Sequence, residues 1–204
     1  MGRGMLRWMR DDAPPAPPET DDERATIRKA QAGDRRAFDR LVSAQLPQVW
    51  ATVYRILRHR EDTEDVVQEV FVTAHRALAG FRGDSKLSTW LHRIAVSRAL
   101  NHLDRAEERV RRASDPIDDG PALDALRSGR GPLHALEAKE LMSRLADCFE
   151  KLPAAFRAVL ALRDAQEKTY EEIAAIVGIE LGTVRSRLAR ARGSLKDCIE
   201  GRGA

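Results

Sequence analysis

The chain has 204 residues, with 35 Lys and Arg against 32 Asp and Glu, which gives a formal net charge of +3 at pH 7. This length allows one ordinary domain or two small ones, and 43% hydrophobic residues exclude a wholly disordered chain. The uncharged apolar stretches are far shorter than the roughly 20 residues of a membrane-spanning helix, and the basic amino terminus lacks the apolar segment of a secretory signal. We therefore expect a cytoplasmic protein without membrane insertion.

The small net charge hides strong local charge. Residues 61–69 hold five acidic residues and no basic one. Residues 93–112 hold six arginines against three acids, and residues 183–196 hold five bases and no acid. One acidic and two basic faces indicate more than one partner, and basic faces are typical of nucleic-acid binding.

Cysteine and histidine spacing gives no sign of a metal site. Cys148 and Cys198 lie far apart in the sequence, and neither has a second Cys or a His at metal-ligand spacing. This disfavours a disulfide framework or a zinc ribbon, so we expect two inert thiols, with oxidant sensing as the alternative. No Gly-rich phosphate loop or nucleophile elbow occurs either. We expect no metal, no cofactor and no catalytic residue.

Proline and glycine mark two breaks along the chain. Four prolines stand within residues 14–18, so residues 1–21 are expected to form a flexible tail. Three prolines and three glycines fall within residues 113–134, which predicts a flexible linker between two separate cores. The predicted domains are residues 22–112 and residues 135–204.

Both domains are predicted to be all-α, because apolar residues recur at helical spacing and no alternating strand pattern occurs. In the first domain, we expect a bend or break at Pro47 and a helix that starts with Asp62 as its cap. A further helix is expected over residues 87–110. In the second domain, we expect helices over residues 135–152, 154–164, 170–177 and 183–199, with Thr183 as the cap of the last.

Residues 170–192 have the pattern of a helix-turn-helix. This motif needs a small residue where the helices touch, a residue that tolerates positive φ in the turn, and an apolar anchor on the second helix. Ala174, Gly178 and Val184 meet these needs in that order. The second helix carries arginines and a serine outward, which suits phosphates and guanine edges in a major groove. The alternative is a solvated basic helix.

Three segments together resemble the extracytoplasmic-function (ECF) sigma factors of bacterial RNA polymerase. They are residues 62–78 (DTEDVVQEVFVTAHRAL), residues 81–103 (FRGDSKLSTWLHRIAVSRALNHL) and the helix-turn-helix, in the order that this family shows. The resemblance implies a sigma region 2-like domain at residues 22–112 and a sigma region 4-like domain at residues 135–204. It implies a protein without enzymatic activity.

The resemblance also implies site residues. The core polymerase contact would be made by Asp65, Gln68 and Glu69. The −10 promoter element would be read by Arg82, Asp84, Ser85, Lys86, Trp90, Arg93, Ser97, Arg98 and Asn101. Trp90 also stands at core spacing, which favours packing over stacking on a base. The −35 element would be read by Thr183, Arg185, Ser186, Arg187, Ala189, Arg190 and Arg192, with Arg187 and Arg192 on phosphates.

The implied partners are core RNA polymerase, promoter DNA and an anti-sigma factor that silences the protein. A second hypothesis is a stand-alone helix-turn-helix regulator whose amino-terminal bundle dimerises or senses a ligand. The two differ in DNA binding, because a dimeric regulator binds a palindromic duplex unaided, whereas a sigma factor needs core polymerase and a bipartite site.

Overall fold

The computed structural model describes residues 21–113 and 143–201, and no strand occurs among them. The predicted tail and linker therefore lie outside the described residues, apart from one residue of each. In the described part, no helix is both long and apolar enough to cross a membrane. The elements are α1 (Asp21–Gln31), α2 (Arg35–Leu57), α3 (Arg60–Ala77), the 3-10 turn η2 (Leu78–Gly80), α4 (Leu87–Ala113), helical residues 143–150, α6 (Ala154–Leu160), the π-helical turn η3 (Ala161–Ala165), α7 (Tyr170–Val177) and α8 (Leu181–Ile199). The all-α prediction is confirmed.

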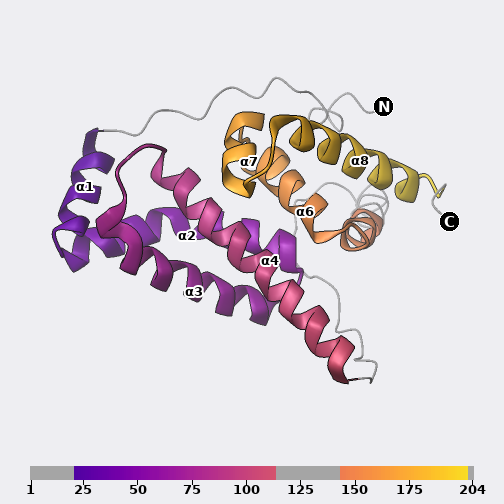
Figure 1. Cartoon of the computed structure of the whole chain (residues 1–204), viewed down its shortest axis with the longest axis horizontal. Coiled ribbons are helices and arrows are strands. Elements are labelled where there is room, and N and C mark those ends of the chain that lie inside the picture. Colours follow the sequence, from indigo (N-terminus) through magenta and orange to yellow (C-terminus); the bar gives the residue numbers. More distant parts are fainter. Residues whose placement is uncertain (1–20, 114–142, 202–204) are drawn as a thin grey trace, which may run out of the picture.

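The first region, residues 21–113, packs α2, α3 and α4 against one another, with α1 against α2 (Figure 1). Pro47 lies inside α2, which continues from Arg35 to Leu57, so the predicted break does not occur. The cost of about 3 kcal/mol for an interior proline is offset because both halves of α2 bury residues in the same core. Leu41 is buried before the proline, and Val53 and Ile56 after it.

Two predicted helix caps are wrong. α3 starts at Arg60, and the cap is His59, whose Nδ1 accepts a hydrogen bond from the Asp62 backbone N–H at 3.4 Å. α8 starts at Leu181 after Glu180, which places Thr183 inside the first turn. Neither observed cap, His59 or Glu180, is one of the short polar residues that usually occupy this position, so residue type alone does not fix where these helices begin. Asp62 instead lies in the first turn, where an acid also favours the helix dipole.

The second region, residues 143–201, contains the predicted helix-turn-helix. Thr169 and Glu172 form a reciprocal capping box that starts α7, and Gly178 ends it with φ of +73°. Val184 and Leu188 of α8 are fully buried. The predicted turn and anchor are confirmed.

The two regions share one continuous apolar core, and their helices lie side by side (Figure 1). α4 packs against α7, and α2 packs against α6. The two predicted domains therefore pack against each other in this arrangement. A region of this size buries only part of its apolar surface alone, and the contact between the regions buries more of it.

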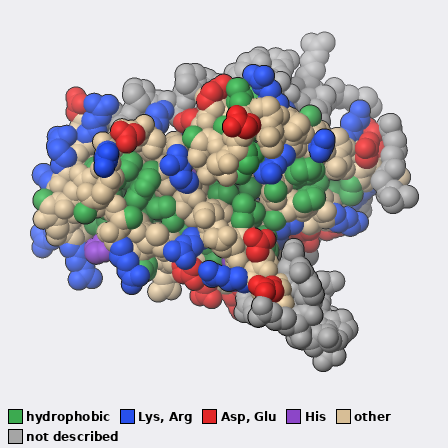
Figure 2. All heavy atoms as spheres, in the orientation of Figure 1, with side chains coloured by type: hydrophobic (Ala, Val, Ile, Leu, Met, Phe, Trp, Pro, Cys, Tyr) green, Lys and Arg blue, Asp and Glu red, His purple; other side chains and the backbone are tan. Residues whose placement is uncertain are grey.

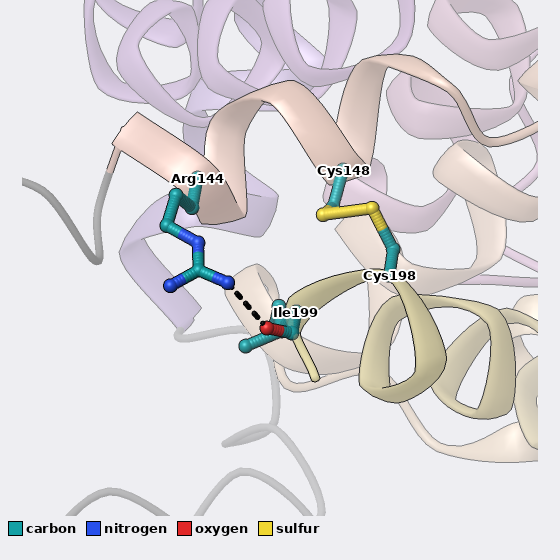
Figure 3. Close-up of a disulfide and its surroundings, with 4 residues drawn as sticks. All are labelled: Arg144, Cys148, Cys198 and Ile199. Atoms are coloured by element: carbon teal, nitrogen blue, oxygen red, sulfur yellow. Dashed lines mark hydrogen bonds between the residues drawn. A yellow bond between two sulfur atoms is a disulfide. The ribbon is translucent and has the colours of Figure 1, made fainter. Parts of the chain in front are cut away.

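Cys148 and Cys198 form a disulfide that joins residues 143–150 to the last turn of α8 (Figure 3). The prediction of two inert free thiols is therefore wrong. The two residues are 50 positions apart in sequence, yet their Cα atoms lie 5.8 Å apart. The folded arrangement of the second region brings them together, and sequence spacing carries no signal of it.

Candidate nucleic-acid and polymerase interfaces

The acidic face consists of Asp65, Gln68 and Glu69, which are all exposed on α3. They lie outward because the opposite side of this helix carries the buried valines of the core. Val72 is 43% exposed and lies one turn further along the same side. Sequence reasoning missed this apolar residue, although its position outside the buried stripe could have revealed it.

Polar contacts link the acidic face and the start of α3 to α4. Glu69 lies 3.5 Å from Arg98, and Arg98 also donates to the Thr73 hydroxyl at 3.1 Å. Asp62, nearer the start of α3, lies 3.4 Å from His102. These are surface contacts, so each adds little to the free energy of unfolding. The structure therefore brings a residue predicted to bind polymerase into contact with one predicted to bind DNA.

The loop of residues 81–86 is fixed at its start by Gln31 of α1 and Trp90 of α4. The Gln31 side-chain amide donates to the backbone oxygens of Leu78 at 3.1 Å and Phe81 at 2.7 Å. The Phe81 ring packs on Trp90 with centroids 5.2 Å apart, and Trp90 borders the core. Trp90 therefore packs in this structure, as its spacing predicted. Among the loop residues predicted to read the −10 element, Arg82 and Asp84 are exposed, and Ser85 and Lys86 are half-buried.

The α4 face consists of Arg93, Ser97 and Asn101, which are exposed and recur at intervals of four residues. Its first residue already has a partner in the second region. The Arg93 Nε donates to the backbone oxygen of Ala175 in α7 at 3.1 Å. One end of the α4 face is thus occupied by α7.

A buried polar cluster lies behind the α4 face. His92 is fully buried, and its Nδ1–H donates to the Ser88 backbone oxygen at 2.6 Å. Burial is the main cause that lowers the pKa of His92 to about 4, so the ring is neutral at pH 7. The buried Lys168, which precedes α7, donates to the Ser88 hydroxyl at 3.3 Å. Among the described residues, His92 Nε2 has no hydrogen-bond partner.

The α8 face consists of Arg185, Ser186, Ala189 and Arg190, which are all exposed. Its orientation follows from the opposite side of α8, where residues at helical spacing are buried in the core. Thr183 and Arg187 flank this face and are half-buried. Figure 2 shows that Lys and Arg side chains lie over both regions on the side of the molecule in view.

Arg192 is placed differently from the other candidates on α8. Its Nη2 lies 3.1 Å from the Asp164 carboxylate in η3, and only 15% of its side chain is exposed. The structure therefore does not bring Arg192 to the α8 face. The sequence places Arg192 on a basic helix but does not reveal its acidic partner, Asp164, which lies in another element.

Two family models match the chain in succession. The first, "Sigma-70 region 2", matches residues 41–109, and the second, "Sigma-70, region 4", matches residues 142–195. The RNA polymerase sigma-H factor of Pseudomonas aeruginosa is 34% identical over 177 residues, which cover 85% of this chain and 92% of that protein. The ECF RNA polymerase sigma-E factor of Escherichia coli K12 is 36% identical over 186 residues, which cover 87% of this chain and 94% of that protein.

Solved structures share the fold. The structure of CnrH in complex with the cytosolic domain of CnrY has a TM-score of 0.61 and 27% identity, and the match covers 90% of this chain and 100% of that one. The sigma factor RpoE in complex with the anti-sigma factor NepR from Bartonella quintana has a TM-score of 0.67 and 23% identity, with 80% and 96% covered.

Proposed function

The chain belongs to the ECF sigma factors of bacterial RNA polymerase, and we propose that three faces on its two regions divide the work of promoter recognition. As a sigma factor, it directs the core polymerase to specific promoters and promotes DNA opening for initiation. The observation that carries the assignment of faces is that each predicted set lies mainly on the exposed side of one helix or loop. The chain acts in the cytoplasm with the polymerase and performs no catalysis itself.

The acidic face binds core polymerase. Exposed carboxylates and an amide at Asp65, Gln68 and Glu69 suit a basic surface, where they form charge-assisted hydrogen bonds and steer association. We add Val72 to this face, because a 43% exposed valine beside three polar groups provides apolar contact area.

The loop of residues 81–86 and the α4 face read the −10 element. Capture of an unstacked base needs a polar pocket, and a single strand needs cations along its backbone. Arg82, Asp84, Ser85 and Lys86 supply the polar groups, and Trp90 supports the loop by packing. The strand then follows Arg93, Ser97, Arg98 and Asn101 along α4.

The α8 face reads the −35 element in the major groove. Arg185 and Arg190 are exposed and long enough to reach guanine edges, and Ser186 and Ala189 lie between them. Thr183 and Arg187 lie at the margin, where they contact phosphates. Arg192 joins them only after it leaves Asp164.

The two regions separate before they bind both elements. The −10 and −35 elements are about 25 base pairs apart, which at about 3.4 Å per pair is roughly 85 Å along the duplex. In the structure, Arg93 of α4 and the Ala175 backbone oxygen of α7 are 3.1 Å apart. The arrangement described is therefore a closed form. An anti-sigma factor, as in the related solved structures, is the partner proposed to keep such a form silent.

The test is co-purification with core RNA polymerase, followed by run-off transcription from a promoter library with and without the protein. We expect a stable complex and new, sharply bounded transcripts. Binding to a palindromic duplex without core polymerase would instead support a stand-alone regulator, and the roles of all three faces would be withdrawn.

A further inference from the structure

The disulfide lies in the second region, on the opposite end of α8 from its proposed DNA-reading residues. Cys148 is 6% exposed, and Cys198 is half-buried at the border of the core. A second contact runs beside the disulfide, because the Arg144 Nη2 donates to the Ile199 backbone oxygen at 2.8 Å (Figure 3). Helical residues 143–150 therefore contact α8 through packing and a hydrogen bond as well as through sulfur. Because these contacts do not involve sulfur, we expect the two thiols to remain close in the reduced chain.

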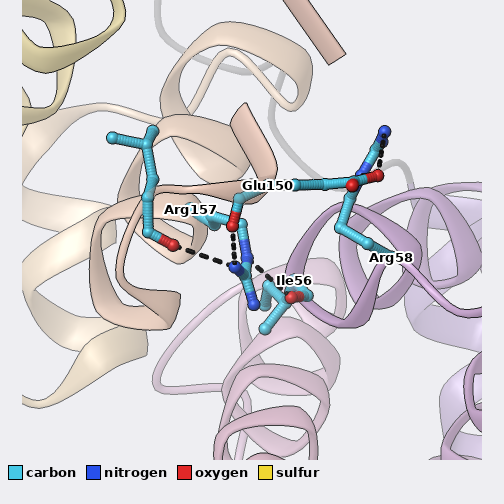
Figure 4. A network of polar contacts seen from close by, with 5 residues as sticks. Ile56, Arg58, Glu150 and Arg157 are labelled. Atoms are coloured by element: carbon cyan, nitrogen blue, oxygen red, sulfur yellow. Dashed lines mark hydrogen bonds and ion pairs between the residues drawn. The ribbon is translucent and has the colours of Figure 1, made fainter. Parts of the chain in front are cut away.

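The residues next to Cys148 also hold the first region. The Glu150 carboxylate accepts from Arg58 Nε at 3.4 Å and Nη2 at 3.3 Å, where α2 ends. Arg157 of α6 donates to the backbone oxygens of Glu150 at 3.0 Å and of Ile56 at 2.8 Å (Figure 4). The segment fixed by the disulfide is thus one of two, together with α6, through which the second region contacts the end of α2.

This contact supports the closed form. With the second region held against α2, α7 lies on α4, where Ala175 accepts from Arg93 and Lys168 donates to Ser88. Residues 143–150 are held by their contacts with Ile199 of α8, with Arg58 and with Arg157 of α6. The position of Glu150 therefore depends on what fixes residues 143–150, and the disulfide is the covalent part of that support.

We propose that Cys148 and Cys198 form a reversible thiol–disulfide site, and that the disulfide state stabilises the closed arrangement of the two regions. RNA polymerase works where thiols are kept reduced, so the disulfide forms only when an oxidant is present. A hydroperoxide is the class of oxidant that fits a small, partly buried site.

The chemistry proceeds in two steps. The sulfur of Cys198, the more exposed of the two, attacks the peroxide oxygen; it becomes a sulfenic acid, and the peroxide leaves as an alcohol, or as water from hydrogen peroxide. The Cys148 sulfur then attacks the Cys198 sulfur, the S–O bond breaks, and water leaves as the disulfide forms. A dithiol reductant reduces the Cys148–Cys198 disulfide by thiol–disulfide exchange, which yields two thiols and the oxidised reductant.

The test uses the full chain, oxidised with hydrogen peroxide or reduced with dithiothreitol, then desalted into the same buffer. Intact mass should show the loss of two hydrogens on oxidation. Small-angle X-ray scattering should give a larger radius of gyration for the reduced chain, and run-off transcription with core polymerase should be about threefold higher. Equal radii for the two forms would overturn the link to closure. Absence of the disulfide after peroxide treatment of the folded chain would overturn the site.

Three variants test disulfide formation and closure separately. Glu150→Gln should still form the disulfide, yet the difference in radius of gyration between its oxidised and reduced forms should be smaller than in the unmodified chain. Glu64→Gln is the matched control, because the Glu64 carboxylate pairs with Arg60 on its own helix, α3, at 3.0 Å. Cys148→Ser with Cys198→Ser should show no response to peroxide. A peroxide-dependent change of radius in this double variant would contradict the proposal.

Discussion

The two regions present their proposed DNA-reading residues in different ways. The α8 face of the second region is exposed along its length, whereas the α4 face of the first region meets α7 at Arg93. The second region therefore covers part of the first while its own reading helix stays open. Closure therefore covers part of the α4 face and leaves the α8 face exposed. The shared core determines how strongly the two regions are held together.

The largest expected effect concerns the shared core. Ile56 is fully buried at the end of α2, and its backbone oxygen accepts from Arg157 of α6. Ile56→Ala should lower the free energy of unfolding by about 2–5 kcal/mol, because it leaves a cavity. Since the core is continuous, urea denaturation followed by circular dichroism should show one transition that moves as a whole.

The control for this change is Leu46→Ala, because Leu46 is 40% exposed on the same helix. Its effect should stay within about 0.5 kcal/mol. If Ile56→Ala instead split the curve, with one transition shifted and another unchanged, the two regions would be independent folding units and the shared core would contribute little.

The second prediction concerns pH. The pKa of His92 is lowered from 6.5 to about 4, chiefly by burial, with Lys168 lowering it further and Glu172 raising it. Between pH 6.5 and pH 4, the unfolded chain binds a proton at His92 that the folded chain does not bind. The free energy of unfolding therefore has its full value above about pH 6.5 and decreases as the pH falls towards 4. The loss amounts to about 3 kcal/mol at most.

Urea denaturation at about pH 7 and pH 4.5 should therefore show a larger acid loss for the unmodified chain than for His92→Gln. The difference between the two proteins isolates His92 from the other groups that titrate in this range. An equal loss in both would mean that the imidazole is protonated without cost, and that the contact between α4 and the second region is open to water.

Much of this fold follows from the sequence because its signals are local. Helical spacing, the Gly178 turn and the outward arginines of α8 each depend on residues a few positions apart. The disulfide, the shared core and the Arg192–Asp164 pair depend on which elements meet in space. The cap residues were misplaced because the observed caps, His59 and Glu180, are not the short polar residues that usually occupy this position, and Glu180 makes no side-chain capping hydrogen bond.

The third prediction separates two arginines on α8. Arg190 is exposed on the α8 face, so Arg190→Ala should leave the fold intact and reduce discrimination at one base pair of the −35 element by about 1–3 kcal/mol. Arg192→Ala should instead lower the free energy of unfolding, because it leaves Asp164 half-buried without its 3.1 Å partner. Run-off transcription from a −35 library, together with thermal unfolding, measures both. An equal loss on every −35 sequence for Arg190→Ala would contradict its role in base recognition.

The smallest effect is expected on the acidic face. Glu69→Gln removes one exposed charge that lies 3.5 Å from Arg98, and should weaken binding to core polymerase by about 0.5–1 kcal/mol, more at low salt than at high salt. Glu64→Gln on the same helix is the control, since it removes the same charge outside the acidic face. Competition for core polymerase against a reference sigma factor, at two salt concentrations, provides the measurement. If both variants weaken binding equally, the general charge of α3 matters and the individual position of Glu69 does not, so the first region would dock by long-range attraction while the second recognises DNA by direct contacts.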